Sequence, residues 1–267
     1  MPITSAPPLS VAEAQTKILD RIRTLGAERV PLSEASGRVA AGPVTSALDL
    51  PPWDNSAMDG YAVRAAEVAP GGELPVTLDL PAGAASGRRL PDGAAARIMT
   101  GAPMPAGADA VVPVEDTTGP AGEARFAEIG ENVRFDVRPE PGAHVRRRAE
   151  DVRRGAAVLE SGDVIRPARI ALLATVGRAE VEVVRRPRVA IVSTGDELVD
   201  LDRAGTPDRI VNGNAHGLAA QIAAAGGAPH PLPIAPDEPE AIRAAIRAAL
   251  EHDAVVTIGG VSVGPRD

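Results

Sequence analysis

Two carboxylates and a glycine-rich stretch are the residues of this sequence best placed to do chemistry. Asp196 and Glu197 follow the β-branched run at residues 189–192, and Gly195 stands just before them. Carboxylates at a strand end are reasonable ligands for Mg²⁺, which prefers one or two of them together with waters and substrate phosphates. The alternative is that one of them caps the next turn. Residues 259–264, Gly-Gly-Val-Ser-Val-Gly, can direct main-chain N–H groups at an anion, although a tight turn is the simplest interpretation of such a stretch.

Two further side chains could contribute to the same site. Ser262 lies within the glycine-rich stretch and could donate a hydrogen bond to a bound oxygen. Asp237 is a third candidate carboxylate. With Glu240 three residues on, it also fits an ordinary helix N-cap, and the two roles can coexist. The glycine pattern is neither a nucleotide-binding P-loop nor the Rossmann fingerprint, and none of the four histidines is placed for a metal cluster.

A parallel sheet would bring these residues together. An unbroken apolar run bounded by glycine is typical of a strand buried on both faces. Helix-like and strand-like stretches then alternate, which predicts a β-α-β-α-β unit in which ligands lie at the carboxyl ends of the strands. We therefore expect one crevice to hold residues 193–197 and 259–264. The predicted elements are strands at 189–192, 229–234 and 254–258 and helices at 212–225 and 237–250.

A second unusual stretch, residues 48–63, collects large side chains that are rare in this chain. It contains Trp53, Tyr61 and Met58 among Pro, Asn, Ser and Gly, a composition typical of a loop. With Asp59 beside them, these residues favour a loop that presents polar groups on a fixed support. The alternative is an anchoring loop whose aromatic residues fill a core.

Residues 73–128 are predicted to be β-rich. Short strands at 75–80, 95–99, 110–115 and 125–129 are separated by Gly- and Pro-rich turns. Thr100 falls at the end of the second of these strands. Threonine is usually a turn former there, so a substrate role for Thr100 is the minority interpretation.

Residues 144–154 form a basic segment with five arginines in an otherwise acidic chain. Glu150 and Asp151 lie inside it. The usual outcome of such a run is a solvated cluster in which the charges pair with one another. Binding of phosphate or another oxyanion is the sharper alternative, because the arginine fork matches such oxygens.

Three elements outside these regions are also predicted. Ser10 and Glu13 form a capping-box pattern, and helical spacing continues to Leu25 before Gly26. So short a helix is not stable alone, so we expect it to pack on another domain or subunit. A second helix is predicted at residues 167–176, and a strand follows at 180–184.

The composition excludes several classes of protein. The chain has 267 residues, of which 44% are hydrophobic, and its net charge of −8 argues against nucleic-acid binding. The absence of cysteine excludes disulfides, thiolate metal sites and a cysteine nucleophile within these residues. Lys17 is the only lysine, so lysine catalysis is not expected. With no apolar run long enough for a membrane and no signal-peptide pattern, the expected location is the cytoplasm.

Three motifs together give the sequence a family resemblance. They occur in this order: residues 52–63 with Asn-Ser-Ala-Met-Asp-Gly-Tyr-Ala, residues 188–198 with Ser-Thr-Gly-Asp-Glu-Leu, and residues 259–264. With residues 97–103 and 146–151 between them, the chain resembles the molybdopterin molybdenumtransferase family, the MoeA type also found in gephyrin. The first motif is highly specific, whereas the other two are shared more widely among molybdopterin-binding domains.

The resemblance implies a multidomain fold that combines α/β and β-rich parts. Residues 1–45 and 146–186 would form an N-terminal linker and dimerisation domain that contains the first helix. Residues 46–145 would form an inserted β-rich domain. Residues 187–267 would form the α/β/α molybdopterin-binding domain, whose parallel sheet is incomplete because the chain ends inside it, without the C-terminal β-barrel domain of the family.

The resemblance also implies an activity in molybdenum cofactor biosynthesis. Enzymes of this family take molybdate and adenylylated molybdopterin (molybdopterin-AMP), release AMP with Mg²⁺, and leave molybdenum on the dithiolene. The catalytic positions that match are Asp59, Thr100, Asp151, Glu197, Asp237 and Asp267. The implied metal ligands are Glu197, Asp196 and Asp237, and the implied substrate-binding residues are Ser193, Thr194, Gly195, Gly259, Gly260, Ser262 and Gly264.

The same resemblance implies partners. Family members are homodimers with the active site between the molybdopterin-binding domain of one subunit and the β-rich domain of the other. Asp59, Thr100 and Asp151 would then come from the partner subunit. Molybdopterin adenylyltransferase and molybdoenzyme apoproteins are further partners that the family suggests.

Two other functions stay open at this point. One is a non-catalytic dimeric scaffold, or a pterin-binding fragment that lacks the C-terminal domains. The other is a molybdopterin adenylyltransferase, against which the long region before residue 187 argues.

Overall fold

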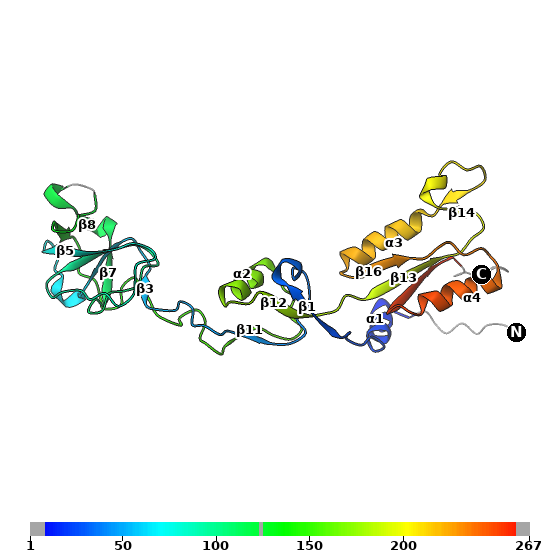
Figure 1. Cartoon of the computed structure of the whole chain (residues 1–267), viewed down its shortest axis with the longest axis horizontal. Helices are drawn as coiled ribbons and strands as arrows, with labels where there is room; N and C mark the ends of the chain where they lie inside the picture. Colours follow the sequence, from blue (N-terminus) through cyan, green and yellow to red (C-terminus); the bar gives the residue numbers. More distant parts are fainter. Residues whose placement is uncertain (1–8, 123–124, 260–267) are drawn as a thin grey trace. The chain divides into compact units, whose positions relative to one another are not determined.

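The computed structural model describes residues 9–122 and 125–259, which form two compact units (Figure 1). The β-rich unit comprises Pro43–Leu159 and Thr175–Gly177. The α/β unit comprises Met1–Gly42, Glu160–Ala174 and Arg178–Asp267. Residues 146–159 thus lie in the compact β-rich unit, and the finer division into three domains stays a prediction.

The α/β unit contains the predicted β-α-β-α-β arrangement. β13 (Arg188–Ser193) is central, with β16 (Ala228–Pro231) on one side, β17 (Ala254–Ile258) on the other, and all three strands parallel. Helices α3 (Gly213–Ala224) and α4 (Pro239–Ala249) make the crossovers and lie on opposite faces of the sheet (Figure 1). Every residue of β13 after the first is buried, as expected for an apolar strand covered on both faces.

The start of α4 corrects one prediction. The helix begins at Pro239, with Glu238 at the N-cap position and no side-chain cap. Pro239 forces extended backbone on Glu238, at φ −111° and ψ 129°. Asp237 therefore lies outside the helix and is not its N-cap. β16 also ends at Pro231, three residues before the predicted strand end.

A small parallel ribbon lies between β13 and α3. β14 (Leu198–Val199) pairs with β15 (Ile210–Val211), and the 3₁₀ turn η5 (Leu201–Arg203) lies in the connection. The ribbon leads into Asn212, whose side-chain oxygen accepts a hydrogen bond from Ala215 N at 3.4 Å and caps α3. Strands of two residues have no readable period, so the sequence does not indicate them.

The N-terminal helix is shorter than predicted. α1 spans Val11–Leu19, and both hydrogen bonds of the capping box between Ser10 and Glu13 are present. Beyond it, the N–H groups of Arg21 and Ile22 bond three residues back, which tightens the turn and ends the helix. No residue of α1 is buried in the described chain, and packing on another domain or subunit stays a prediction.

Two further predicted elements of the α/β unit are confirmed, and two others were not predicted. β12 (Glu180–Val184) is the expected strand and pairs antiparallel with β1 (Ala27–Pro31), which precedes the 3₁₀ turn η1 (Leu32–Glu34). α2 (Pro167–Thr175) is the expected helix before Gly177. Across residues 9–122 and 125–259, the helices are too short or too polar to span a bilayer.

The β-rich unit is built on a six-stranded sheet in the order β7-β4-β6-β5-β9-β8. Neighbouring strands are antiparallel except β5 and β6, which run parallel. The strands predicted at 75–80, 95–99 and 110–115 are confirmed. Residues 60–63, predicted as loop, are instead a buried strand, because Tyr61 and Val63 fill the core of the unit. The bounds are β4 (Gly60–Val63), β5 (Glu73–Leu80), β6 (Ala95–Ile98), β7 (Ala110–Pro113), β8 (Thr117–Thr118) and β9 (Asn132–Phe135).

Short pairs and turns complete this unit. β3 (Asn55–Ser56) pairs with β10 (Val145–Arg146), and β2 (Val44–Thr45) pairs with β11 (Ala157–Leu159), both antiparallel. The 3₁₀ turns are η2 (Ala65–Glu67), η3 (Val114–Asp116) and η4 (Pro120–Gly122).

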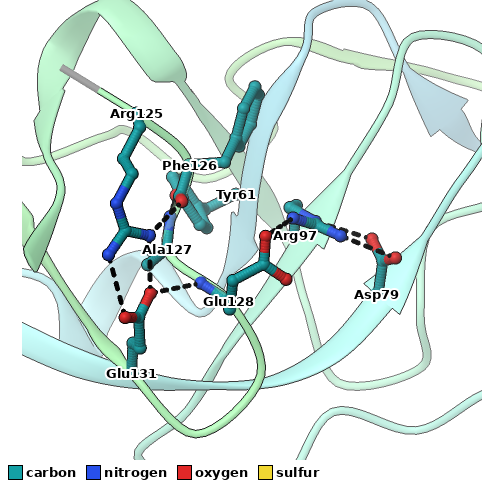
Figure 2. A network of polar contacts seen from close by, with 8 residues as sticks. All are labelled: Tyr61, Asp79, Arg97, Arg125, Phe126, Ala127, Glu128 and Glu131. Carbon is teal, nitrogen blue, oxygen red and sulfur yellow. Dashed lines mark hydrogen bonds and ion pairs between the residues drawn. The ribbon is translucent and has the colours of Figure 1, made fainter.

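Residues 125–129 are not the strand that the sequence predicts. Ala127 N donates to the Tyr61 hydroxyl oxygen at 2.7 Å, and Glu128 N donates to Glu131 Oε2 at 2.7 Å (Figure 2). Side chains therefore use the N–H groups that a strand ladder would need. Arg125 donates to both carboxylate oxygens of Glu131, at 2.8 and 2.9 Å, which folds the segment into a turn.

Candidate functional site

The carboxyl ends of the three parallel strands meet at one edge, which we call the carboxyl edge (residues 193–197, Ala235 and Gly259). Thr194 N donates to Ile258 O at 3.3 Å, and Gly195 N donates to Ala235 O at 3.2 Å. A Cβ on Gly259, which has φ +94°, would lie 3.0 Å from Thr194 Oγ1. The strand end at 193–197 and the first residue of the glycine-rich stretch are therefore neighbours, as predicted.

The sequence-predicted residues of this edge differ in accessibility. Ser193 is buried, so its side chain belongs to the interior of the sheet, whereas Thr194 is half-buried and Gly259 is exposed. Their substrate-binding roles stay predictions. The remaining predicted residues of this edge lie outside the described part of the chain: Gly260, Ser262, Gly264 and Asp267.

The carboxylates at the carboxyl edge are exposed and close to main-chain groups. Asp196 Oδ1 accepts a hydrogen bond from Asp237 N at 3.1 Å, which joins the ends of β13 and β16. Glu197 folds back over Gly195, because a Cβ built there would lie 2.6 Å from Glu197 Oε2. Within the described residues, neither these two carboxylates nor that of Asp237 is paired with a cation.

These carboxylates do not form a ready-made metal cage. Among residues 9–122 and 125–259, no three His, Cys, Asp or Glu side chains gather into a group that could hold a metal ion. One or two carboxylates are nevertheless what Mg²⁺ takes from a protein when a substrate phosphate and waters supply the other oxygens. The side chains of Asp196 and Glu197 are exposed and have no cation partner in the part of the chain that the structure describes, so they fit that mode of binding.

A cation that the sequence analysis did not single out lies at the same edge. Arg209 Nη1 donates to the main-chain oxygen of Asp196, and the arginine side chain is exposed. Arg209 directly precedes β15, so its position depends on the β14–β15 pairing. No residue spacing indicates that pairing, and only a structure reveals this contact.

In the β-rich unit, two predicted site residues contact each other. Asp59 Oδ1 accepts hydrogen bonds from Thr100 N at 2.7 Å and from Thr100 Oγ1 at 2.8 Å. Both residues are exposed, and the main-chain N–H of Thr100 lowers the pKa of Asp59 below its ordinary value. The backbone beside Asp59 has little freedom, because a Cβ on Gly60 would lie 2.1 Å from Val112 O.

The basic segment pairs with carboxylates, one inside the segment and two outside it, so the predicted pairing within the segment is confirmed only in part. Arg147 contacts Asp54 at 2.8 Å, and Arg148 contacts Asp49 at 2.7 Å. Asp151, a predicted catalytic residue, contacts Arg146 at 2.5 Å. Asp151 thus differs from the carboxylates of the carboxyl edge in having a cation partner.

The 48–63 stretch combines both interpretations that its sequence allows. Tyr61 is fully buried and packs against Phe126 and Phe135, so this aromatic residue fills the core. Trp53 and Met58 are 46% and 37% exposed, so the stretch also presents large side chains to solvent.

Taken together, the fold and the site define a class: an α/β unit with carboxylates and Gly259 at the carboxyl ends of parallel strands, combined with a β-rich unit. Comparison with known families agrees with this class. The family model "MoeA N-terminal region (domain I and II)" matches residues 9–177, and "Probable molybdopterin binding domain" matches residues 190–267. The chain belongs to the MoeA family.

Relatives and solved structures extend this similarity over nearly the whole chain. Molybdopterin molybdenumtransferase 2 of Mycobacterium tuberculosis (strain H37Rv) is 40% identical over 261 residues, 96% of this chain and 62% of the relative. The molybdopterin molybdenumtransferase of Nostoc sp. (strain PCC 7120) is 43% identical over 246 residues, 90% of this chain and 54% of the relative. The crystal structure of the molybdopterin biosynthesis protein moeA from Pyrococcus horikoshii OT3 aligns with a TM-score of 0.82 at 31% identity. That alignment covers 94% of this chain and 66% of that one. The chain therefore spans between 54% and 62% of the length of these two relatives.

Proposed function

We propose that this chain acts in molybdenum cofactor biosynthesis as a molybdopterin molybdenumtransferase. In this proposal it takes molybdate and adenylylated molybdopterin and releases AMP in a Mg²⁺-dependent reaction. The observation that carries the proposal is the carboxyl edge, where exposed carboxylates that have no cation partner among the described residues adjoin the start of a glycine-rich stretch. A relative that is 43% identical over 246 residues bears the name of this activity.

The proposed roles follow from the charge of the substrate. The bond that breaks joins two phosphates, so negative charge must be neutralised where it breaks. Asp196 and Glu197 would hold Mg²⁺, with Asp237 beside them, and the bound ion would supply that neutralisation. Main-chain N–H groups of the glycine-rich stretch would hold the pterin-side phosphate.

The β-rich unit would complete the site from a second subunit. Asp59 and Thr100 are exposed and fixed to each other, so they are prepared to contact a substrate at no ordering cost. The homodimer, the contribution of Asp151 from the partner, and encounters with molybdopterin adenylyltransferase and molybdoenzyme apoproteins belong to the same proposal.

The test is molybdate-dependent AMP release from adenylylated molybdopterin by the 267-residue chain, with and without Mg²⁺. We expect Glu197→Gln and Asp59→Asn each to reduce the rate roughly 100-fold, the usual effect of removing one charged group from such a site. Asp59→Asn keeps an oxygen that can accept the hydrogen bonds from Thr100. A lower rate in this variant would therefore come from the lost charge and not from a change in folding. Glu240→Gln is the matched control, because Glu240 pairs only with Arg243 on α4 among the described residues.

The rates of AMP release in the two variants test the site assignment. Unchanged rates in both Glu197→Gln and Asp59→Asn would rule that assignment out. If the two inactive variants regain activity when mixed, the site is shared between subunits, and heterodimers without activity would place it within one subunit. Binding of molybdopterin without AMP release would favour the alternative, a non-catalytic dimeric scaffold or pterin-binding fragment.

A further inference from the structure

Arg209, directly before β15, contacts the turn that carries the candidate metal-binding carboxylates. Its Nη1 donates to the main-chain oxygen of Asp196, and the N–H of the next residue, Ile210, donates to Glu197 O at 2.8 Å. Asp196 in turn accepts the N–H of Asp237 at 3.1 Å through its carboxylate. Asp196 therefore links Arg209 to the carboxylate-bearing residues of the carboxyl edge.

The surroundings of Arg209 differ from those of the structural arginines. Arg97, Arg125 and Arg185 each hold a carboxylate through two N–H groups. Arg209 contacts a neutral carbonyl instead, and no carboxylate partner is found for it within residues 9–122 and 125–259. A guanidinium has five N–H donors, so most of its donors stay available at an exposed position.

The backbone before Arg209 supports a fixed direction for this side chain. Asp208 has φ +57°, a left-handed conformation that residues other than glycine adopt at a cost. The main-chain bond from Ile210 N to Glu197 O ties this segment to the carboxyl edge, and the side-chain bond from Arg209 Nη1 to Asp196 O joins it there. The guanidinium is thus presented by a defined turn and not by a free loop.

The electrostatics of the carboxyl edge call for such a cation. Asp196, Glu197 and Asp237 would repel a doubly phosphorylated ligand, and one Mg²⁺ carries only two of the charges needed to offset them. A planar guanidinium donates two parallel hydrogen bonds to phosphate oxygens, which also fixes the orientation of the phosphate.

We propose that Arg209 is a substrate-binding residue that holds a phosphate of a diphosphate-bearing ligand at the carboxyl edge. The inference rests on the proposed function, because it names the group that binds the substrate of that reaction. A competing role is purely structural, with Arg209 serving only to hold the Asp196 carbonyl.

Three substitutions separate these roles. Arg209→Gln keeps a polar side chain with N–H donors, shorter by two bonds, and removes the charge. Arg209→Lys keeps the charge and removes the fork, and Arg209→Ala removes both. Arg203→Gln is the matched control, because Arg203 is an exposed arginine of the same loop, on η5.

The experiment measures binding of ADP, as a diphosphate probe, to the whole 267-residue chain by calorimetry, together with the thermal unfolding midpoint. We expect Arg209→Gln to weaken ADP binding on the order of 10- to 100-fold at an unchanged midpoint. Arg209→Lys should fall between it and the unchanged chain, and Arg203→Gln should match the unchanged chain. Guanidinium chloride at millimolar concentration should restore part of the ADP binding of Arg209→Ala.

Two results would overturn the inference. One is ADP affinity that stays the same in Arg209→Gln while Arg209→Ala loses both affinity and thermal stability, which is what a structural role predicts. The other is an unchanged chain that does not bind ADP. A failure of the proposed function would give a different result. In that case the chain would release no AMP, while its ADP binding would still depend on Arg209.

Discussion

The β-rich unit contains a polar network in which Arg97 pairs with Asp79 and Arg125 pairs with Glu131. This network and the carboxyl edge of the α/β unit use the same types of side chain, arginines and carboxylates, in opposite ways. In the network, Arg97 donates to both oxygens of Asp79, at 2.8 and 2.9 Å, and Arg125 holds Glu131 in the same manner (Figure 2). At the carboxyl edge, the Asp196 carboxylate accepts the main-chain N–H of Asp237, and the Arg209 cation contacts a carbonyl. Paired charges hold a fold together, whereas unpaired charges stay available for a ligand.

Asp59 shows that this distinction does not follow the boundary between the units. It belongs to the β-rich unit, yet its partners are the N–H and hydroxyl of Thr100 and not an arginine. Asp59 resembles the carboxylates of the carboxyl edge in having no cation partner among the described residues. Asp151, which pairs with Arg146, resembles the network.

The largest effect that would test the comparison is expected at Gly195. A Cβ there would lie 2.6 Å from Glu197 Oε2 and would push the Glu197 carboxylate away, at a φ of +145° that disfavours any other residue. We expect Gly195→Ala to reduce AMP release on the order of 100-fold. Unfolding of the β-rich unit, followed by the fluorescence of Trp53, should stay unchanged.

Gly205→Ala is the control for the backbone effect. Gly205 has φ +83° and nothing within 4 Å of an added Cβ, so alanine strains the chain there without displacing a carboxylate. If Gly205→Ala lost as much activity as Gly195→Ala, backbone strain and not the position of Glu197 would explain the loss.

A smaller effect, on stability and not on activity, is expected in the network. Arg97→Met leaves Asp79 without its partner while the remaining side chain still fills the space. We expect the free energy of unfolding of the β-rich unit to fall by about 1–2 kcal/mol, since Arg97 and Asp79 are 19% and 34% exposed. Urea unfolding measures this change, and AMP release per folded molecule should not change.

Arg134→Met is the matched substitution. Arg134 lies 3.7 Å from Asp136, and the two side chains are 51% and 44% exposed, so their pairing contributes roughly 0–1 kcal/mol. Equal losses in the two variants would mean that geometry and burial do not separate structural ion pairs from incidental ones.

The sequence predicts the elements that local patterns determine. The apolar run at 189–192 becomes the central buried strand because its burial on both faces is visible in its composition. The capping box at Ser10 forms because both of its residues lie within one helical turn. The neighbourhood of Thr194 and Gly259 follows from the parallel order of the strands.

The failures come from contacts that distant residues make. Residues 125–129 have strand-like composition, but the hydroxyl of Tyr61, 66 positions away, accepts the N–H of Ala127. The contact of Asp59 with Thr100 joins residues 41 positions apart, and no spacing rule reaches that far. Arg209 reaches the carboxyl edge only through a pair of two-residue strands. Which charges are paired, the property that separates the two regions, is therefore visible only in the folded chain.

The smallest expected effect is the acid sensitivity of the network. Arg125 and the N–H of Glu128 lower the pKa of Glu131 from an ordinary 4.5 to about 2. A carboxyl group whose pKa is depressed by folding stabilises the fold above its unfolded pKa and loses that contribution as pH falls towards its folded pKa. The thermal midpoint of the β-rich unit should therefore decline between pH 4.5 and about 2, and less steeply in Glu131→Gln.

Glu140→Gln, at an exposed position of the same unit, should keep the slope of the unchanged chain. Equal slopes in all three proteins would show that the Arg125–Glu131 pair is as incidental to stability as a solvated surface pair, and the contrast between paired and unpaired carboxylates would then have to rest on Arg97 and Asp79 alone.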